Sequence, residues 1–289
     1  MTAGVRTVCV IGTGLIGGSL ALALKKAGFC QRIVGAGRTE ATLKKAVELG
    51  VVDGYETDFA LAAKDADIVV VAVPLSAMKN VFEQIAPALS STAIVTDAGS
   101  AKQSVIKDAE LAFGKNFNRF VAGHPISGTE KSGVTAAFTE LYENRKVILT
   151  PTESVDVEAV RLVADMWRAA GADVETMDAA HHDMVLAGTS HLPHVLAFGL
   201  VDCLNSLEDV DEIFRFAAGG FRDFTRIASS DPVMWRDICL SNRDDILVMM
   251  KKYEDELKTI CSALESKDGD ALIDIFSRAK KARDQFNNQ

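Results

Sequence analysis

The chain has 289 residues and a formal net charge of −9, from 31 Lys and Arg against 40 Asp and Glu. Hydrophobic residues make up 48% and charged residues 25%, which is typical of a globular protein and excludes an intrinsically disordered one. The longest uninterrupted apolar run, residues 68–73, is far shorter than the roughly 20 residues that cross a bilayer, so we expect no membrane segment.

The acidic balance argues against a nucleic-acid partner, because nucleic-acid binding needs a phosphate-neutralising basic surface. It does not exclude an anionic substrate, but the positive charge for such a substrate has to be gathered locally. The five cysteines are odd in number and lie at least 21 residues apart, without zinc-ribbon spacing. This pattern predicts buried thiols in the reducing cytoplasm. At about 150 residues per domain, the length favours two domains.

Strand patterns and helix patterns alternate over the first half of the chain. In chain order we predict strands over residues 7–11, 32–34, 68–73, 93–96, 120–122, 146–149 and 172–177, and helices over residues 15–27, 39–49, 101–113 and 155–170. Strands that alternate with helices indicate βαβ units. The sequence therefore predicts an α/β domain with one doubly wound parallel sheet, which the strands 146–149 and 172–177 complete.

Strand patterns disappear after residue 177, and helix patterns follow one another to residue 286. We predict breaks between these helices near residues 205–209, 219–220, 231–232 and 268–269. The architecture is therefore an α/β domain over residues 1–178, followed by an all-α domain over residues 179–289.

A glycine-rich turn follows the first predicted strand and begins the first predicted helix. Gly12, Gly14 and Gly17 have the spacing of the Rossmann dinucleotide fingerprint, and Leu15 and Ile16 lie between them. The first glycine permits the tight turn, the second lets the backbone approach a pyrophosphate, and the third packs the helix on the strand. We predict that these five residues bind a dinucleotide, although a glycine turn without a ligand has the same pattern.

The end of the second strand indicates which dinucleotide is bound. NAD sites usually place an acid about 20 residues after the glycines, where it accepts hydrogen bonds from the ribose hydroxyls. Here that position is Gly37, followed by Arg38, and a 2′-phosphate fits against the arginine. The cofactor is therefore NAD or NADP, with a preference for NADP. Arg38 stacked on the adenine, or Glu40 acting as the missing acid, are the alternatives.

Three polar segments follow strands of the predicted sheet, at the edge where open α/β sheets bind ligands. Val73 and Pro74 begin the first segment, residues 97–102 form the second, and His124 lies in the third. We assign Val73 and Pro74 to the cofactor site. His124 is the best candidate for a general base, because imidazole accepts a proton near neutral pH. A structural histidine at a strand end is the alternative.

The helical half has two further candidate clusters. Residues 181–183 (His-His-Asp) precede residues 190–194 (Ser-His-Leu-Pro-His), but the proline interrupts the helical spacing, so we expect substrate contacts or core packing rather than a metal site. Arg222 and Arg226 follow a diglycine with the spacing of one helical face. Guanidinium groups suit carboxylates, although a surface ion-pair role is the alternative.

Six segments, taken together and in order, carry a resemblance over essentially the whole chain. They are GTGLIGGS, VPLSAM, TDAGSAK, GHPISGTEKSG, SHLPH and GGFRDFTRIASSDPVMWRDI. They resemble the prephenate/arogenate (cyclohexadienyl) dehydrogenase family of tyrosine biosynthesis. The resemblance implies NAD(P)+-dependent oxidative decarboxylation of prephenate, or of its amino analogue arogenate, to 4-hydroxyphenylpyruvate or tyrosine.

The resemblance also implies roles for individual residues. His124 is similar to the base that takes the proton of the ring hydroxyl, and Ser100 to the serine that hydrogen-bonds this hydroxyl. Arg226 resembles the arginine that binds a substrate carboxylate, Arg222 adds positive charge, and Glu130 is similar to the acid that gates the arginine.

Further substrate contacts follow from the same resemblance. Ser190 and His194 match substrate-side residues, Asp183 a supporting acid, and Trp235 a residue that reaches the site from the partner subunit. The family dimerises through its helical domain, and this agrees with the amphipathic pattern of residues 243–264.

Two other functions fit parts of the pattern. A dehydrogenase of the β-hydroxyacid type shares the glycine fingerprint and a helical second domain, but such chemistry usually depends on a lysine. A dinucleotide sensor without chemistry would need neither His124 nor the arginine pair. Arogenate specificity or dual specificity also remains open, because prephenate and arogenate share the ring.

Overall fold

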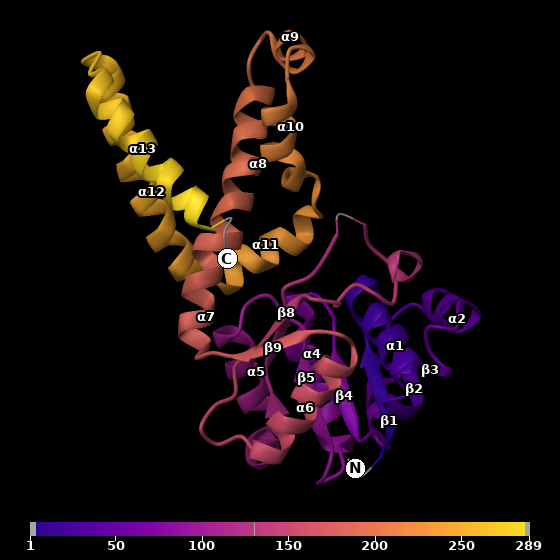
Figure 1. The fold of residues 1–289 in the computed structure, drawn as a ribbon. Helices are drawn as coiled ribbons and strands as arrows, with labels where there is room; N and C mark the ends of the chain where they lie inside the picture. The colour runs from indigo at the N-terminus through magenta and orange to yellow at the C-terminus, as the bar shows by residue number, and fades with distance from the viewer. Residues whose placement is uncertain (1–3, 130, 287–289) are drawn as a thin grey trace. The chain divides into compact units, whose positions relative to one another are not determined.

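The computed structural model describes residues 4–129 and 131–286. The chain divides into two compact units, Met1–Arg243 and Asp244–Gln289 (Figure 1). All of the predicted site residues lie in the first unit. The second unit consists of two helices, most of α12 (Arg243–Glu265) and α13 (Gly269–Phe286).

The first unit begins with a sheet of six parallel strands in the order β3-β2-β1-β4-β5-β6. The strands are β1 (Val5–Ile11), β2 (Cys30–Ala36), β3 (Gly54–Glu56), β4 (Ile68–Val71), β5 (Ile94–Asp97) and β6 (Phe120–Val121). The helices around it are α1 (Leu15–Ala27), α2 (Glu40–Glu48), α3 (Phe59–Ala63), α4 (Leu75–Ile85), α5 (Gln103–Phe113) and α6 (Val157–Ala169). This strand order confirms the predicted doubly wound α/β fold and places its switch point between β1 and β4.

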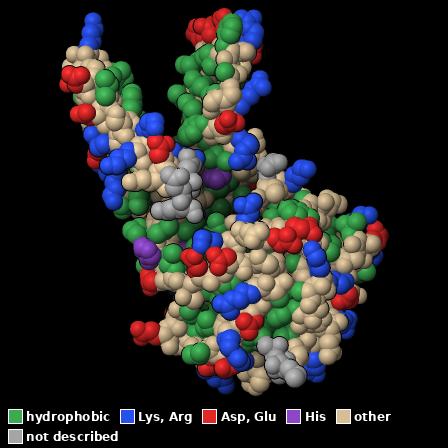
Figure 2. Space-filling model, in the orientation of Figure 1, with side chains coloured by type: hydrophobic (Ala, Val, Ile, Leu, Met, Phe, Trp, Pro, Cys, Tyr) green, Lys and Arg blue, Asp and Glu red, His purple; other side chains and the backbone are tan. Residues whose placement is uncertain are grey.

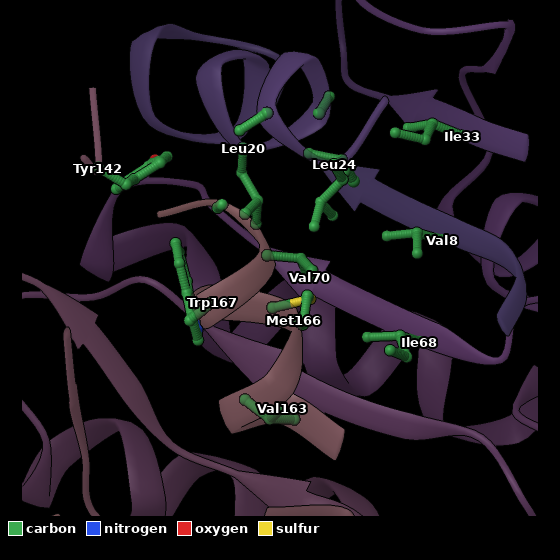
Figure 3. Close-up of a cluster of buried hydrophobic side chains, with 14 of the residues drawn as sticks. Val8, Leu20, Leu24, Ile33, Ile68, Val70, Tyr142, Val163, Met166 and Trp167 are labelled. Atoms are coloured by element: carbon green, nitrogen blue, oxygen red, sulfur yellow. The ribbon is translucent and has the colours of Figure 1, made fainter. Parts of the chain in front are cut away.

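Alternate residues of the central strands face two separate cores. Val8 and Val10 pack with α1 and α6, whereas Cys9 and Ile11 pack with α3, α4 and α5. Figure 3 shows Leu20 and Leu24 of α1 and Trp167 of α6 over the first of these faces. Because both faces are covered, β4 is apolar at every position, and for this reason the short run of residues 68–71 was recognisable in the sequence.

A second sheet of three strands corrects one prediction. Residues 146–149 and 172–177 do not complete the parallel sheet, because β8 (Lys146–Leu149) and β9 (Asp173–Thr176) form a separate sheet with β7 (Gly123–Pro125). The first sheet ends at β6, which has two residues, and Ala122 separates it from β7. After Ala122, β7 pairs antiparallel with β8. The short strand β3 was also missed, because three residues give too little pattern.

Helices follow from residue 179, as predicted. Within the first unit they are α7 (Ala179–Leu186), a π-helical segment (Ala187–His191), α8 (Leu192–Asn205), α9 (Val210–Arg215), α10 (Gly219–Thr225), a 3₁₀ turn (Arg226–Ser229) and α11 (Pro232–Ser241). The Asp231 side chain accepts a hydrogen bond from the amide of Met234 at 2.7 Å, which confirms the predicted helix start. Gly219 and Gly220 form the first turn of α10, so the break lies just before them.

The helix that runs from Ala179 to Asn205 is apolar along most of its length. By length and composition it is the one helix among the described residues that could cross a membrane, and 22% of its most apolar window is buried. Exposed apolar surface of this extent is typical of a helix that packs against a partner.

Candidate active site

The glycine turn is shaped by two close backbone approaches. Gly12 has φ of +97°, and a Cβ atom there would lie 2.3 Å from the carbonyl oxygen of Ala72, at the end of the neighbouring strand β4. A Cβ atom on Gly17 would lie 2.1 Å from the carbonyl oxygen of Gly12. Only glycine fits at these two positions, so the turn is held tightly between β1, α1 and the residues after β4.

The start of α1 has the features of an anion site. Gly14 is its N-cap residue and provides no side-chain cap, and the first turn contains no acidic residue. A Cβ atom on Gly14 would meet nothing within 4 Å. The free backbone amides and the positive end of the helix dipole therefore face open space, into which a pyrophosphate fits. Leu15 is buried, and Ile16 packs against the core below.

The residues after β4 lie beside the same turn. The Cγ1 atom of Val73 lies 3.1 Å from the position that a Cβ atom on Gly12 would take, and Pro74 is the N-cap residue of α4. Both predicted cofactor residues are therefore at the switch point of the sheet, where doubly wound folds bind dinucleotides.

The end of β2 leaves Arg38 exposed and without an ion pair among the described residues. Glu40, the alternative acid for the ribose, lies in the first turn of α2 and is engaged elsewhere. Its Oε1 accepts a hydrogen bond from the Tyr55 hydroxyl at 2.9 Å and pairs with Lys44 Nζ at 3.2 Å. Arg38 is therefore a positive charge without an ion pair at this end of the sheet, although Glu56, in register with Ala36 at the end of β3, also has no ion pair among the described residues.

A fully buried ion pair joins the two sheets. Lys102 Nζ lies 2.5 Å from Asp97 Oδ2, at the end of β5, and 2.7 Å from the carbonyl oxygen of Gly123 in β7. Asp97 also accepts hydrogen bonds from the amides of Gly99 at 2.7 Å and Gly123 at 3.0 Å. These contacts hold the loop that contains Ser100 against the strand that contains His124. Burial lowers the pKa of Lys102, and Asp97 opposes this shift.

His124 is the first member of a buried chain of three side chains. Its Nδ1 lies 2.9 Å from Nε2 of His182, and Nδ1 of His182 lies 2.8 Å from Oδ1 of Asp183. Asp183 also accepts hydrogen bonds from the amides of Lys102 at 2.8 Å and Gln103 at 2.9 Å, at the start of α5. All three side chains of the chain are buried.

The environment keeps His124 neutral and Asp183 charged. Burial lowers the pKa of His124 well below the ordinary value of 6.5, and the nearby His182, Lys102 and His191 lower it further. Burial alone would raise the pKa of Asp183, but the hydrogen bonds from His182 and from the amides of Gln103 and Lys102 lower it below its usual range. A neutral imidazole with an ionised carboxylate two groups away is the arrangement of a general base.

The helical residues form a second cluster, in which Trp235 and His194 stack. Their ring centroids lie 3.7 Å apart at an interplanar angle of 18°. Trp235 therefore packs on a histidine of its own chain, and the expectation that it reaches the site of a partner subunit stays a prediction. His194 Nδ1 lies 2.9 Å from the carbonyl oxygen of Ser190, within the π-helical segment.

Arg226 lies close to this stacked pair. Burial lowers the pKa of His194, the carbonyl of Ser190 opposes the shift, and the charge of Arg226 lowers it further. Arg222 lies on α10, but that helix ends at Thr225 and Arg226 begins the 3₁₀ turn, so the two arginines do not share one regular helical face. Glu130 lies outside the described residues.

Sequence reasoning found His124 and Asp183 but missed the residues that connect them to their surroundings. His182 was considered only as part of the cluster 181–183, for substrate contacts or core packing, and Asp97 and Lys102 only as part of a loop motif. Adjacent histidine and aspartate residues directly before an apolar helix were the available signal. Among the described residues, no group of three His, Cys, Asp or Glu side chains could hold a metal ion.

A dinucleotide cradle at the switch point of a doubly wound sheet, with a buried neutral histidine at a neighbouring strand end, defines a nicotinamide-dinucleotide-dependent dehydrogenase. A model of the prephenate dehydrogenase nucleotide-binding domain matches residues 20–176, and a model of the prephenate dehydrogenase dimerization domain matches residues 178–278. The chain belongs to the prephenate dehydrogenase family.

Known relatives cover nearly the whole chain. A cyclohexadienyl dehydrogenase of Zymomonas mobilis is 38% identical over 96% of this chain and 95% of that protein. A prephenate dehydrogenase of Bacillus subtilis is 39% identical over 96% of this chain and 75% of that protein. The crystal structure of prephenate dehydrogenase from A. aeolicus with hydroxyphenyl propionate and NAD+ has a TM-score of 0.92 and 37% identity, and the match covers 99% of this chain and 100% of that one.

Proposed function

We propose that the chain catalyses the NAD(P)+-dependent oxidative decarboxylation of prephenate or arogenate in tyrosine biosynthesis. The observation that carries the proposal is the buried His124–His182–Asp183 chain, in which the neutral imidazole of His124 lies on β7, the strand that a hydrogen bond joins to the end of β5. In this proposal residues 1–178 bind the dinucleotide, and residues 179–289 bind the substrate and form a homodimer. The cysteines are free, which supports a reducing, cytoplasmic location, but only Cys9 is buried and Cys203 and Cys261 are exposed, so the prediction of buried thiols is wrong for most of them.

His124 performs the proton transfer in this reaction. The dinucleotide, when bound, accepts the hydride from the ring carbon that bears the hydroxyl. His124 takes the proton of that hydroxyl as the carbon–oxygen double bond forms, and Ser100 hydrogen-bonds the same oxygen. When CO2 leaves, its bonding electrons make the ring aromatic, and the oxygen takes a proton back. The gain in aromaticity drives the reaction, so the protein has to supply position and a base.

Binding of the substrate needs positive charge in a protein whose net charge is −9. Arg226 supplies it as the partner of a carboxylate, with Arg222 adding to the local positive field and Glu130 gating the arginine. Ser190, His194 and Trp235 form the wall of the substrate site, and the stacked pair orients His194.

Reduction of NAD+ and of NADP+, followed by the absorbance of the reduced nicotinamide, tests the proposal with prephenate and with arogenate. We expect turnover with at least one substrate. His124→Asn should lower kcat by about 10²-fold or more with little change in KM, because a general base contributes about 10²–10⁴-fold. Arg226→Ala should mainly raise KM.

The exposed His181, one residue before His182 in the sequence, provides the matched control. His181→Asn should keep the kcat of the unmodified protein. A His124→Asn variant with nearly normal kcat would refute the assignment of the base. Binding of dinucleotide without turnover of either substrate would favour a dinucleotide sensor.

A further inference from the structure

We propose that His182 is a positioning residue that fixes the tautomer of His124, so that Nε2 of His124 is the atom that takes the proton from the substrate. The inference rests on the proposed function, because it assumes that His124 is the base. Beyond the proposed function, it identifies the ring nitrogen of His124 that accepts the proton and the residue that selects this nitrogen.

Asp183 acts only as a hydrogen-bond acceptor, because both of its carboxylate oxygens receive backbone N–H groups. Its Oδ1 accepts the amide N–H of Lys102 at 2.8 Å, and its Oδ2 accepts the amide N–H of Gln103 at 2.9 Å. A carboxylate that receives backbone donors on both oxygens is ionised and can only accept. The contact of 2.8 Å between Oδ1 and His182 Nδ1 therefore requires a proton on Nδ1 of His182.

The proton on Nδ1 of His182 determines which nitrogen of His124 is protonated. A neutral imidazole has one N–H, so a proton on Nδ1 of His182 leaves its Nε2 as a bare acceptor. That Nε2 lies 2.9 Å from Nδ1 of His124, and the two rings meet nearly edge-on at 67°. For this contact to be a hydrogen bond, Nδ1 of His124 must donate. The lone pair of His124 is then on Nε2, the nitrogen that makes no contact with His182.

The surroundings of His182 allow its imidazole ring only one orientation. The side chain is fully buried, with a relative exposure of 0%, and its neighbour Asp183 is anchored to the first turn of α5. A rotated His182 ring would lose the carboxylate and leave a buried donor unpaired, which costs about 1–3 kcal/mol by general experience with such groups. Without His182, the proton of His124 would distribute over both ring nitrogens, and molecules protonated at Nε2 would have no base for the substrate.

Nitrogen NMR of the histidine rings tests the inference directly, because bare and protonated ring nitrogens have well-separated shifts. In the whole protein with labelled histidine, His124→Asn assigns the signals of His124. We expect a protonated Nδ1 and a bare Nε2 in the unmodified protein. His124 protonated mainly at Nε2 would overturn the inference, whatever the activity of the protein.

Two substitutions separate positioning from packing. His182→Gln keeps an acceptor that reaches towards His124, and we expect it to keep most of the kcat. His182→Leu keeps the volume without the acceptor, so kcat should fall at least about tenfold with little change in KM, and the His124 signals should show mixed tautomers. Equal kcat values for the Gln and Leu variants would contradict the inference, and His181→Leu serves as the control.

Failure of this inference differs from failure of the proposed function. If neither prephenate nor arogenate is oxidised, the proposed function fails, but the ring-nitrogen shifts still report whether His182 fixes the tautomer. If turnover is found and the tautomer is the reverse, only the role of His182 is wrong. If the His182→Leu variant does not fold, the ring-nitrogen shifts of the unmodified protein and the kcat of the His182→Gln variant test the inference.

Discussion

At the scale of single residues, we propose that Arg38 sets the preference between NAD and NADP. Its guanidinium is exposed and has no ion pair among the described residues, and the nearest acid at the start of α2, Glu40, is bound to Tyr55 and Lys44. A 2′-phosphate at this position would meet a positive charge, and Glu40 is not free to accept hydrogen bonds from the ribose hydroxyls of NAD. We therefore favour NADP.

Arg38→Ala tests this preference. The substitution should raise the KM for NADP+ about tenfold or more, because a charge-assisted hydrogen bond contributes about 1.5–3 kcal/mol. It should change the KM for NAD+ by less than about twofold. The KM values for both dinucleotides provide the measurement. Arg161→Ala, on the surface of α6, is the control. An equal rise in the KM values for NAD+ and NADP+ would mean that Arg38 contacts a chemical group that the two cofactors share, and would contradict the preference for NADP.

The position of a site residue was predictable from the sequence where the residue directly follows a predicted strand. His124 follows a strand end and Gly12 follows a strand, so their places at the sheet edge follow from topology. The role of His182 was not predictable, because nothing in the local sequence says that α7 packs against β7 and α5. Its partner across the hydrogen bond is 58 residues away in the chain.

At the scale of elements, helices and buried strands were predicted well and strand partners were not. The bounds of α1 and β8 agree with the prediction to the residue, because periodicity, glycines and apolar runs are local properties. The pairing of β7 with β8 depends on the break between β6 and β7 at Ala122, and no sequence pattern marks this break. The π-helical segment was also missed; π-helical turns often accompany functional sites, and this one contains the candidate substrate residue Ser190.

The helix α8 predicts a dimer. Of its fourteen residues only Ala197 is buried, although most of them are apolar. Figure 2 shows hydrophobic side chains gathered over α8 to α10, where Phe216 and Phe224 are also exposed. Water-exposed apolar surface of this extent marks an interaction site, and the match to a dimerization domain supports a second copy of the chain as its partner.

Sedimentation equilibrium measures this prediction. We expect a mass of about twice 31.0 kDa for the unmodified chain. Leu200→Glu on α8 should shift the equilibrium towards the monomer, because it places a charge in an apolar interface. Leu111→Glu, on the exposed face of α5, should leave the dimer intact. A monomer at micromolar concentration would contradict the prediction.

At the scale of the whole molecule, buried histidines make stability depend on pH. Burial lowers the pKa of His191 to about 4, with Asp183 opposing and His182 and His194 assisting the shift, and burial also lowers the pKa of His124. A group whose pKa is lower in the folded state binds its proton more readily in the unfolded chain. The stabilisation is therefore complete above about pH 6.5 and is lost as the pH falls towards 4.

Urea unfolding at pH 7.5 and at pH 5, at one protein concentration, checks this. His191 alone should lower the free energy of unfolding by about 2 kcal/mol at pH 5, since each pH unit below 6.5 contributes about 1.4 kcal/mol. The aspartates with lowered pKa lose their contribution only below about pH 4, outside this window. His191→Gln should reduce the pH dependence by the amount that His191 contributes, and equal stability at both values would contradict the argument.

The buried pair of Asp97 and Lys102 limits how the enzyme can move. The dinucleotide turn belongs to the first sheet and His124 to the second, yet one carboxylate accepts hydrogen bonds from both the loop after β5 and the first residue of β7. Sliding one sheet against the other would break the two buried hydrogen bonds that Gly123 of β7 makes with Asp97 and Lys102, and would leave charged groups without these partners. We therefore expect the dinucleotide turn and His124 to move together as one rigid platform. On the proposed function, admission of the substrate and release of the product would then depend on the helices that contain Ser190, Arg226 and Trp235.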